Sequence, residues 1–253
     1  MNGSIRIGSI FGITLRLHVL LLVLFGILII AGESPLVFAI LFGCVLLHEL
    51  GHSLVAMAFG IRVVDITLWP MGGMARMSQI PESTRIETLI ALAGPAVNFL
   101  LALLGLLAAG SIQYPPREAF QWFSFVNLVL GAFNLLPAFP MDGGRVLRAL
   151  LGWRGDWLKA TERAIWIGRW FAITLCLFGF GLWRLGESVP LALTLALVGV
   201  FIWWSGNAEL ASVRARHAWR AAASAARTGF SAEEIAALER FRGRISDSQR
   251  DER

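Results

Sequence analysis

Long runs of uncharged apolar residues restrict the fold of this chain more than any other feature. Six such segments can be drawn, at residues 17–31, 36–59, 86–110, 120–138, 164–184 and 189–206. A helix needs about 20 predominantly apolar residues to cross a bilayer. Only 15% of the 253 residues are charged, whereas about a quarter are charged in soluble domains. The sequence therefore predicts an all-α polytopic membrane protein with about six transmembrane helices. Because the first segment is short, we expect it to extend back through ITLRLH, with Arg16 reaching the interface.

The placement of charged residues predicts how these segments are oriented. With a cytoplasmic N-terminus, the cytoplasmic side holds the tail arginines together with Arg6, Arg16, Arg62, Arg76, Arg85, Arg145, Arg148, Arg154, Lys159 and Arg163. The opposite side holds Glu33, Arg117, Glu118, Arg184 and Glu187. Cytoplasmic loops carry an excess of Lys and Arg. We therefore expect a multi-pass integral membrane protein of a bacterial or archaeal cell membrane, with both termini in the cytoplasm.

The net charge of +5 does not predict a nucleic-acid partner. No basic stripe in the chain carries the interleaved aromatic residues that stack on bases. In a membrane protein a basic balance more often reflects cytoplasmic loops beside anionic lipid, so we expect contact with the lipid bilayer and no nucleic acid. Cys44 and Cys176 both lie in apolar segments, which favours neither a disulfide framework nor a cysteine zinc site.

Residues 61–77 differ from the apolar segments on either side. The stretch IRVVDITLW is rich in β-branched residues, with Val64, Ile66 and Leu68 alternating with the residues between them, and PMGG follows. Alternation followed by turn residues is typical of a strand and hairpin. A strand edge cannot face lipid. We therefore expect a small β-hairpin or sheet at the cytoplasmic edge of the membrane or in a protein-lined cavity.

The composition changes after Gly206, which predicts a domain boundary. Residues 1–206 are expected to form one membrane core, and residues 207–253 a cytoplasmic tail that is helical and partly disordered. Thr84 followed by Glu87 predicts a capping box at the start of the third helix.

The second apolar segment contains three ionisable residues, in the stretch LLHELGHSL. His48 and His52 are one helical turn apart and point the same way, a spacing at which two imidazoles can bind one Zn²⁺. Glu49 lies about 100° around the helix, so it is better placed to act on a water molecule than to bind the ion. Each ionisable group would cost roughly 2–3 kcal/mol or more in mid-membrane without a partner. A functional role is therefore favoured over chance.

A catalytic zinc site usually has three protein ligands and one open position, so a third ligand is needed. Asp142 is the candidate, in the stretch NLLPAFPMDGGR. Two prolines precede Asp142 and two glycines follow it, which predicts a break in the helix. Unwound backbone at membrane depth is tolerated where it lines a cavity. Alone, Asp142 would be interpreted as an ordinary loop aspartate; beside two histidines that lack a ligand, it is the predicted partner.

Three stretches together resemble the motifs of the site-2 protease family of intramembrane zinc metalloproteases. They are HELGH at 48–52, GPAVN at 94–98 and NLLPAFPMDGGR at 134–145, in the family's order and spacing. The resemblance covers about residues 1–206. Many members carry an inserted PDZ domain or a C-terminal pair of CBS domains, for which this sequence has no room. A minimal form of the family is therefore expected, either natural or truncated.

The resemblance implies roles for six residues. His48, His52 and Asp142 would bind Zn²⁺, and Glu49 would be the catalytic acid/base. Asn134 would help to shape the active site, with Asn98 nearby, and one of these amides would contact the substrate backbone or the oxyanion. From the residues alone, hydrogen bonds between helices explain the two asparagines equally well.

The resemblance also implies a substrate class: single-span membrane proteins, such as anti-sigma-factor-like regulators, cut within or near their transmembrane segments in regulated intramembrane proteolysis. The alternative is a zinc or proton transporter that uses the same intramembrane His/Asp cluster. A transporter often has inverted repeats, and none is found. A zinc-binding pseudoenzyme would lack the general base, whereas Glu49 is present. The sequence does not predict the oligomeric state.

Overall fold

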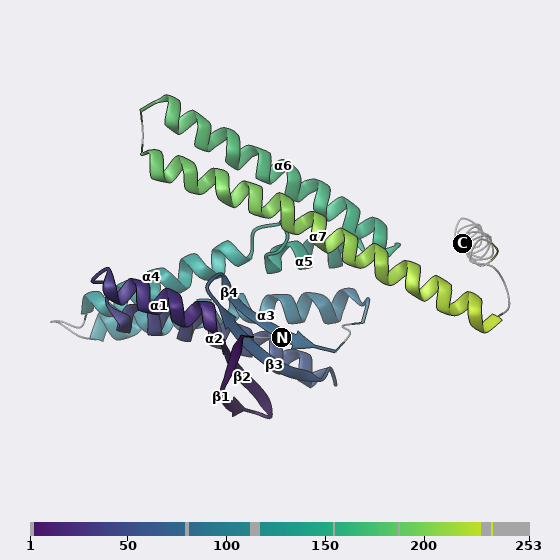
Figure 1. Cartoon of the computed structure of the whole chain (residues 1–253), viewed down its shortest axis with the longest axis horizontal. Coiled ribbons are helices and arrows are strands. Elements are labelled where there is room, and N and C mark those ends of the chain that lie inside the picture. The colour runs from purple at the N-terminus through teal and green to yellow at the C-terminus, as the bar shows by residue number, and fades with distance from the viewer. Residues whose placement is uncertain are drawn as a thin grey trace.

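The computed structural model describes residues 3–78, 81–111, 117–153, 155–186, 188–228 and Glu234. In these residues the chain forms one four-stranded sheet and seven helices (Figure 1). The strands are β1 (Ser4–Ile10), β2 (Ile13–His18), β3 (Val63–Trp69) and β4 (Gly72–Met77). The helices are α1 (Val19–Ile30), α2 (Pro35–Ala58), α3 (Thr84–Ser111), α4 (Arg117–Asn134), α5 (Asp142–Leu151), α6 (Trp157–Arg184) and α7 (Val189–Thr228).

Four helices among the described residues are long and apolar enough to cross a membrane: α2, α3, α6 and α7. All six predicted segments fall largely within helices, but the count of six membrane helices is not confirmed. Helix α1 has 12 residues, and at 1.5 Å per residue it is about 18 Å long, well short of a hydrocarbon core of about 30 Å. Helix α4 has 18 residues and buries the polar side chains of Ser124 and Asn127.

The N-terminal residues form a β-hairpin that was not predicted from the sequence. Strand β1 pairs with β2 in antiparallel fashion, and β2 pairs with β3 in parallel, with Thr14 opposite Asp65. The expected extension of the first membrane helix through ITLRLH is therefore wrong, because those residues are strand β2. Ile13 and Leu15 are buried in the core. The Nε atom of Arg16 lies 3.3 Å from the Asp65 carboxylate, so this side chain forms an ion pair within the sheet.

The hairpin predicted within residues 61–77 is confirmed. Strands β3 and β4 pair in antiparallel fashion, and the order β1-β2-β3-β4 makes β4 an edge strand of the described sheet. The sheet packs on α2 and α3 through an apolar core. Its buried members are Ile13, Leu15, Leu50, Ala56, Ile61, Val63, Ile66 and Ile90. This packing holds β4 beside the half of α2 that carries the two histidines.

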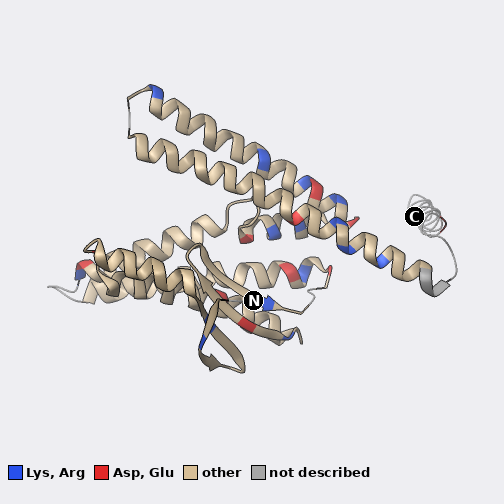
Figure 2. Cartoon of the chain, viewed as in Figure 1, with Lys and Arg blue, Asp and Glu red and all other residues tan. Residues whose placement is uncertain are grey.

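Helices α6 and α7 lie side by side as a long hairpin, with α5 between it and the rest of the molecule (Figure 1). Charged residues gather at one end of this hairpin, on α5 and at the start of α3 (Figure 2), while the helical residues near the loop carry one charge among those described, Arg184 at the end of α6. Helix α7 continues without a break across Gly206. The division at residue 206 stays a prediction, and most of the expected disordered end lies outside the described residues.

Candidate metal centre

Three of the predicted site residues come together from two elements that are far apart in the sequence. His48 and His52 lie one turn apart on α2, and both side chains are buried. Asp142 is the first residue of α5, directly after the non-helical residues 135–141. The predicted break in the helix is therefore confirmed. An ionised Asp in the first turn of a helix also interacts favourably with the positive end of the helix dipole.

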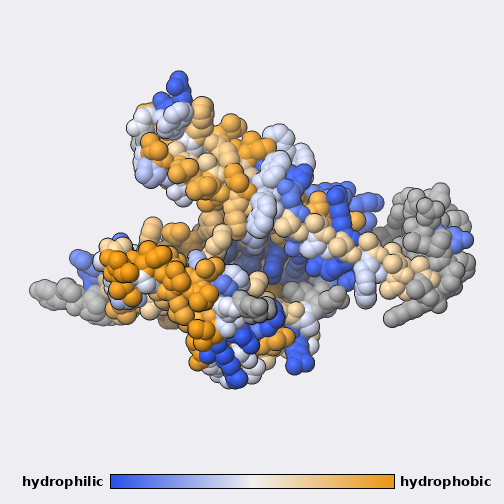
Figure 3. Space-filling model, in the orientation of Figure 1, coloured by the Kyte–Doolittle hydropathy of each residue, from blue (hydrophilic) through white to orange (hydrophobic). Residues whose placement is uncertain are grey.

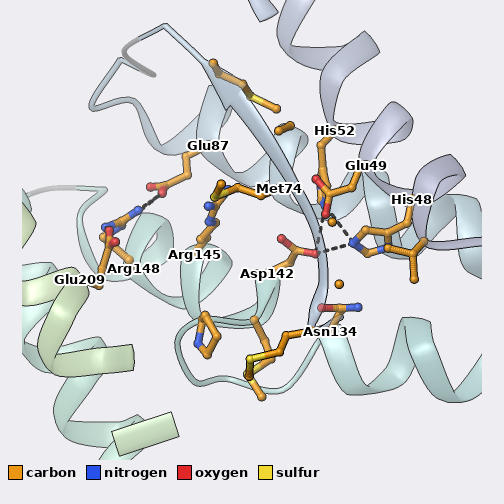
Figure 4. Close-up of a pocket in the computed structure, with 18 of the residues that line it drawn as sticks. His48, Glu49, His52, Met74, Glu87, Asn134, Asp142, Arg145, Arg148 and Glu209 are labelled. Atoms are coloured by element: carbon orange, nitrogen blue, oxygen red, sulfur yellow. Dashed lines mark hydrogen bonds and ion pairs between the residues drawn. The ribbon is translucent and has the colours of Figure 1, made fainter. Parts of the chain in front are cut away.

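The ligand atoms of these three residues converge on one point (Figure 4). Oδ2 of Asp142 lies 3.2 Å from Nε2 of His48 and 3.1 Å from Nε2 of His52. The two Nε2 atoms are 3.0 Å apart. One ligand atom from each residue lies within 4.8 Å of the others, all three residues being buried. The structure therefore brings together the three residues that were predicted to bind a metal ion.

The second ring nitrogen of each histidine is held by a neighbour on α3. Nδ1 of His52 lies 2.6 Å from the carbonyl oxygen of Ile90, and Nδ1 of His48 bonds to Oδ1 of Asn98. A carbonyl oxygen only accepts, so His52 donates through Nδ1 and carries its lone pair on Nε2. The same assignment for His48 leaves both Nε2 lone pairs facing the carboxylate. Hydrogen bonds of this kind orient metal-binding histidines.

The chemistry of this donor set fits a zinc ion. Two Nε2 lone pairs and a carboxylate oxygen repel one another unless a cation or protons lie between them, and Oδ2 of Asp142 is buried without a hydrogen-bond donor among the described residues. Two histidines and one carboxylate form a common catalytic zinc set.

Glu49 faces the same centre from a partly exposed position on α2 (Figure 4). It lines a cavity of about 670 Å³ together with His48, His52, Asp142 and Asn134. The wall of this cavity also includes strand β4 and parts of α5 and α7. Figure 3 shows hydrophilic side chains in the hollow between the α6–α7 hairpin and the rest of the molecule. Water can therefore approach the glutamate and the three ligand residues.

Glycines allow the close approaches that build this centre. A β-carbon at Gly94 of α3 would lie 2.6 Å from Cε1 of His52 and 2.7 Å from Cε1 of His48, so only glycine leaves room for both rings. A β-carbon at Gly144 would lie 2.7 Å from the backbone of Ala138, which explains one glycine after Asp142. Gly94 is not among the predicted site residues; its place in the GPAVN motif was the available signal.

The two asparagines lie in different surroundings. Asn134 lines the cavity at the end of α4, and its Nδ2 donates to the carbonyl oxygen of Leu130 at 3.0 Å. Asn98 is completely buried behind His48 and is not among the residues that line the cavity. Its Oδ1 contacts His48, and its Nδ2 donates to Asn127 at 3.0 Å. These contacts favour a role for Asn98 in orienting His48 over a contact with substrate.

Comparisons with known proteins agree with this geometry. The model of peptidase family M50 matches residues 36–115 and 110–177. A zinc metalloprotease of Methanocaldococcus jannaschii is 37% identical over 217 residues, which cover 83% of this chain and 61% of the relative. Stage IV sporulation protein FB of Bacillus subtilis is 26% identical over 189 residues, which cover 74% of this chain and 63% of that protein.

The fold is similar to that of a solved relative. The site-2 protease from Methanocaldococcus jannaschii has a TM-score of 0.60 and 37% sequence identity, over 82% of this chain and 95% of that chain. The chain spans less than two thirds of the length of the two curated relatives. The family model covers more than half of the chain and includes His48, His52 and Asp142. The chain therefore belongs to peptidase family M50, the site-2 proteases.

Proposed function

We propose that this chain is an intramembrane zinc metalloprotease that hydrolyses peptide bonds within or near the transmembrane segments of single-span membrane proteins. The observation that carries this proposal is the meeting of His48, His52 and Asp142 at one point, with Glu49 in the same cavity. Regulated intramembrane proteolysis of anti-sigma-factor-like regulators is the process that such an enzyme would serve.

Each residue then has a defined part in the chemistry. His48, His52 and Asp142 hold the zinc ion, which when bound supplies Lewis-acid chemistry by acidifying water and polarising a peptide carbonyl. Glu49 takes a proton from the attacking water and passes it to the departing amine. Asn134, on the cavity wall, is the candidate for contact with the substrate backbone. No acyl-enzyme forms in this scheme.

Strand β4 supports a mode of substrate binding. A transmembrane helix hides its carbonyl groups in its own hydrogen bonds, so the substrate must unwind before it can be cut. Strand β4 is an edge strand and lines the cavity beside Glu49, where its Gly73 lies against the glutamate side chain. An extended substrate segment can add to such an edge through main-chain hydrogen bonds.

The decisive experiment uses the purified protein and a panel of single-span substrates. The wild-type chain should cut at least one of them, and a chelator should stop the reaction. Glu49→Gln should keep zinc and lose cleavage. Cleavage by Glu49→Gln at the wild-type rate would contradict the assigned base. Zinc flux in liposomes without any proteolysis would instead favour the transporter.

A proline in β4 tests the mode of substrate binding separately. Met74→Pro removes a backbone donor from the edge strand, because proline has no N–H. It should slow cleavage of a membrane substrate and leave the zinc content unchanged. Unaltered cleavage would exclude addition of the substrate to this strand.

We also propose that both termini face the cytoplasm of a bacterial or archaeal cell. The parallel pairing of β2 with β3 supports a common membrane side for the N-terminus and the sheet, because α1 and α2 lie between these two strands and must return the chain to its starting side. Reporter fusions at each terminus should both report the cytoplasm. Opposite locations would overturn this topology.

A further inference from the structure

A chain of buried hydrogen bonds leads away from His48 through three helices. Nδ1 of His48 bonds to Oδ1 of Asn98 on α3, and Nδ2 of Asn98 donates to Oδ1 of Asn127 on α4 at 3.0 Å. Nδ2 of Asn127 donates to the carbonyl oxygen of Phe123 at 2.9 Å and to Sγ of Cys44 on α2 at 3.3 Å. This series of hydrogen bonds therefore begins at His48 and returns, through Cys44, to the same helix α2.

The hydrogen bond from Asn127 to the carbonyl oxygen of Phe123 fixes the direction of every other hydrogen bond in this series. The carbonyl oxygen of Phe123 can only accept, so the NH₂ group of Asn127 must point toward it. Oδ1 of Asn127 is then left to accept from Asn98, and Oδ1 of Asn98 is left for His48. The ring of His48 must therefore donate through Nδ1, which leaves the lone pair on Nε2.

Because these residues are buried, reversing the direction of the hydrogen bonds would cost free energy. Asn98 and Asn127 are completely buried, and Cys44 is nearly so. If the amide of Asn98 flipped, its NH₂ group would face Nδ1 of His48 and its oxygen would face the oxygen of Asn127. Leaving a buried polar group unsatisfied costs about 1–3 kcal/mol. The flipped amide would also favour the other tautomer of His48, with the proton on Nε2.

The two histidines differ in what sets their tautomers. Nδ1 of His52 faces the backbone carbonyl of Ile90, which no substitution of a side chain removes. Nδ1 of His48 faces an amide whose two ends are nearly alike in shape. Only His48 therefore depends on a second side chain to present its lone pair to the metal.

We propose that Asn127 is a positioning residue that, through Asn98, fixes the tautomer of His48 for metal binding. The inference rests on the proposed zinc site, since a fixed lone pair on Nε2 matters only where a cation binds. Asn127 itself contacts neither the cavity nor the ligand atoms. Its expected effect is on zinc affinity, through an amide that has a single allowed orientation.

The test measures zinc affinity by competition with a chelator in the full-length purified protein. Asn127→Ser is the variant of choice, because a serine hydroxyl can donate to the Phe123 carbonyl four residues earlier but is too short to reach Asn98. Ser124 makes the same kind of bond to Phe120 at 2.8 Å, which shows that α4 accepts this arrangement. Zinc affinity should fall about 10- to 100-fold, the usual range for partners that orient metal ligands.

Ser124→Ala is the matched control. Ser124 is buried on the same helix one turn earlier, and its hydrogen bond to the carbonyl oxygen of Phe120 does not lead to His48. Zinc affinity of this variant should stay within about twofold of the wild type. The unfolding temperature of zinc-free protein should fall by similar small amounts in Asn127→Ser and Ser124→Ala. A drop in zinc affinity in both variants would mean a general packing effect and would overturn the inference.

A double-variant cycle tests whether Asn127 acts through Asn98. Asn98→Ala alone should weaken zinc binding, and adding Asn127→Ser to it should cause no further loss. Losses that multiply would indicate independent structural roles. Nitrogen-15 spectra of histidine-labelled, zinc-free protein give a second measure, because the His48 signal should move from the Nδ1-protonated form toward the Nε2-protonated form in Asn127→Ser.

The outcomes separate this inference from the proposed function. If the wild-type protein binds zinc and Asn127→Ser binds it equally well, the positioning role is overturned while the protease proposal stands. If the wild-type protein binds no zinc, both are overturned.

Discussion

Arg148 of α5 donates two hydrogen bonds, from Nε and from one terminal nitrogen, to the same oxygen of Glu87 in α3. Both side chains are buried, and Arg148 also donates to Glu209 of α7. Glu87 lies one turn before Ile90, whose carbonyl holds His52, while Arg148 shares its short helix with Asp142. The ion pair therefore joins the helix that brings the carboxylate ligand to the helix that supports the histidines.

Removal of this arginine should destabilise the protein strongly. Arg148→Met leaves the Glu87 carboxylate buried without its cation, and breaking a buried pair from one side typically costs about 3–5 kcal/mol. The free energy of unfolding in detergent is the quantity to measure. Arg214→Met is the control, because its pair with Glu162 is exposed and should contribute about 0–1 kcal/mol. Equal losses in the two variants would contradict the structural role assigned to Arg148.

A methyl group at Gly94 should abolish tight zinc binding. Its β-carbon would collide with the imidazole rings of His48 and His52, so the two Nε2 atoms could not keep their present positions. We expect zinc content after dialysis below about one tenth of the wild-type value, given the 10- to 100-fold losses caused by misplaced ligand partners. Gly110→Ala lies in the same helix with open space around it and should keep full zinc content. Full zinc content in Gly94→Ala would show that the rings can move aside.

A methyl group at Gly73 should separate zinc binding from catalysis. A β-carbon there would meet the side chain of Glu49, displacing the glutamate but none of the three ligand residues. Cleavage should fall about 100-fold or more, since a positioned acid/base contributes about 10²–10⁴-fold, while zinc content stays at the wild-type level. Gly8→Ala, in open space on β1 of the same sheet, is the control. Cleavage that survives in Gly73→Ala would place the proton transfer elsewhere.

Asp65 should make the sheet less stable in acid. The hydrogen bond from Arg76 lowers the pKa of Asp65 below its ordinary value; burial opposes this effect, and Arg16 adds to it. The unfolded chain therefore takes up this proton at a higher pH than the folded chain does. The stabilisation is complete above the ordinary Asp pKa of about 3.9 and is lost as the pH falls toward the folded value.

The measurement for this prediction is the unfolding temperature as a function of pH. The wild-type protein should lose stability as the pH falls below about 4, and Asp65→Asn should lose less over the same interval because it has no proton to bind. Identical pH profiles for the two proteins would show that Asp65 is not responsible. The comparison needs no knowledge of the substrate, so it tests the fold alone.

The meeting of His48, His52 and Asp142 could be predicted from the sequence because burying ionisable side chains in an apolar segment costs free energy. Two histidines one turn apart in an apolar helix, and an aspartate in a break between prolines and glycines, have few structural explanations. Gly94 carried no signal of this physical kind, since a glycine in a membrane helix is ordinary and only its place in the GPAVN motif drew attention to it. Its importance follows from the distance between α2 and α3, which no local pattern records.

Elements whose partners are distant in the sequence were harder to predict. The capping box expected at Thr84 and Glu87 is wrong: the Thr84 hydroxyl donates to the carbonyl of Ala149, and Glu87 accepts from Arg148. Helix α3 does begin at Thr84, so the local signal located the boundary correctly. The side chains serve tertiary contacts with α5, which overrides their local preference.

The parallel pairing of β2 with β3 constrains the order in which the molecule can be assembled. Strand β2 ends at His18 and its partner begins at Val63, with α1 and α2 between them. Until synthesis has passed Val63, one edge of β2 lacks its partner strand β3. Such an unpaired edge is open to pairing with other chains. Completion of the sheet must therefore follow synthesis of α1 and α2, so that the strand beside Glu49 takes its place only after the helix that carries the two histidines has been made.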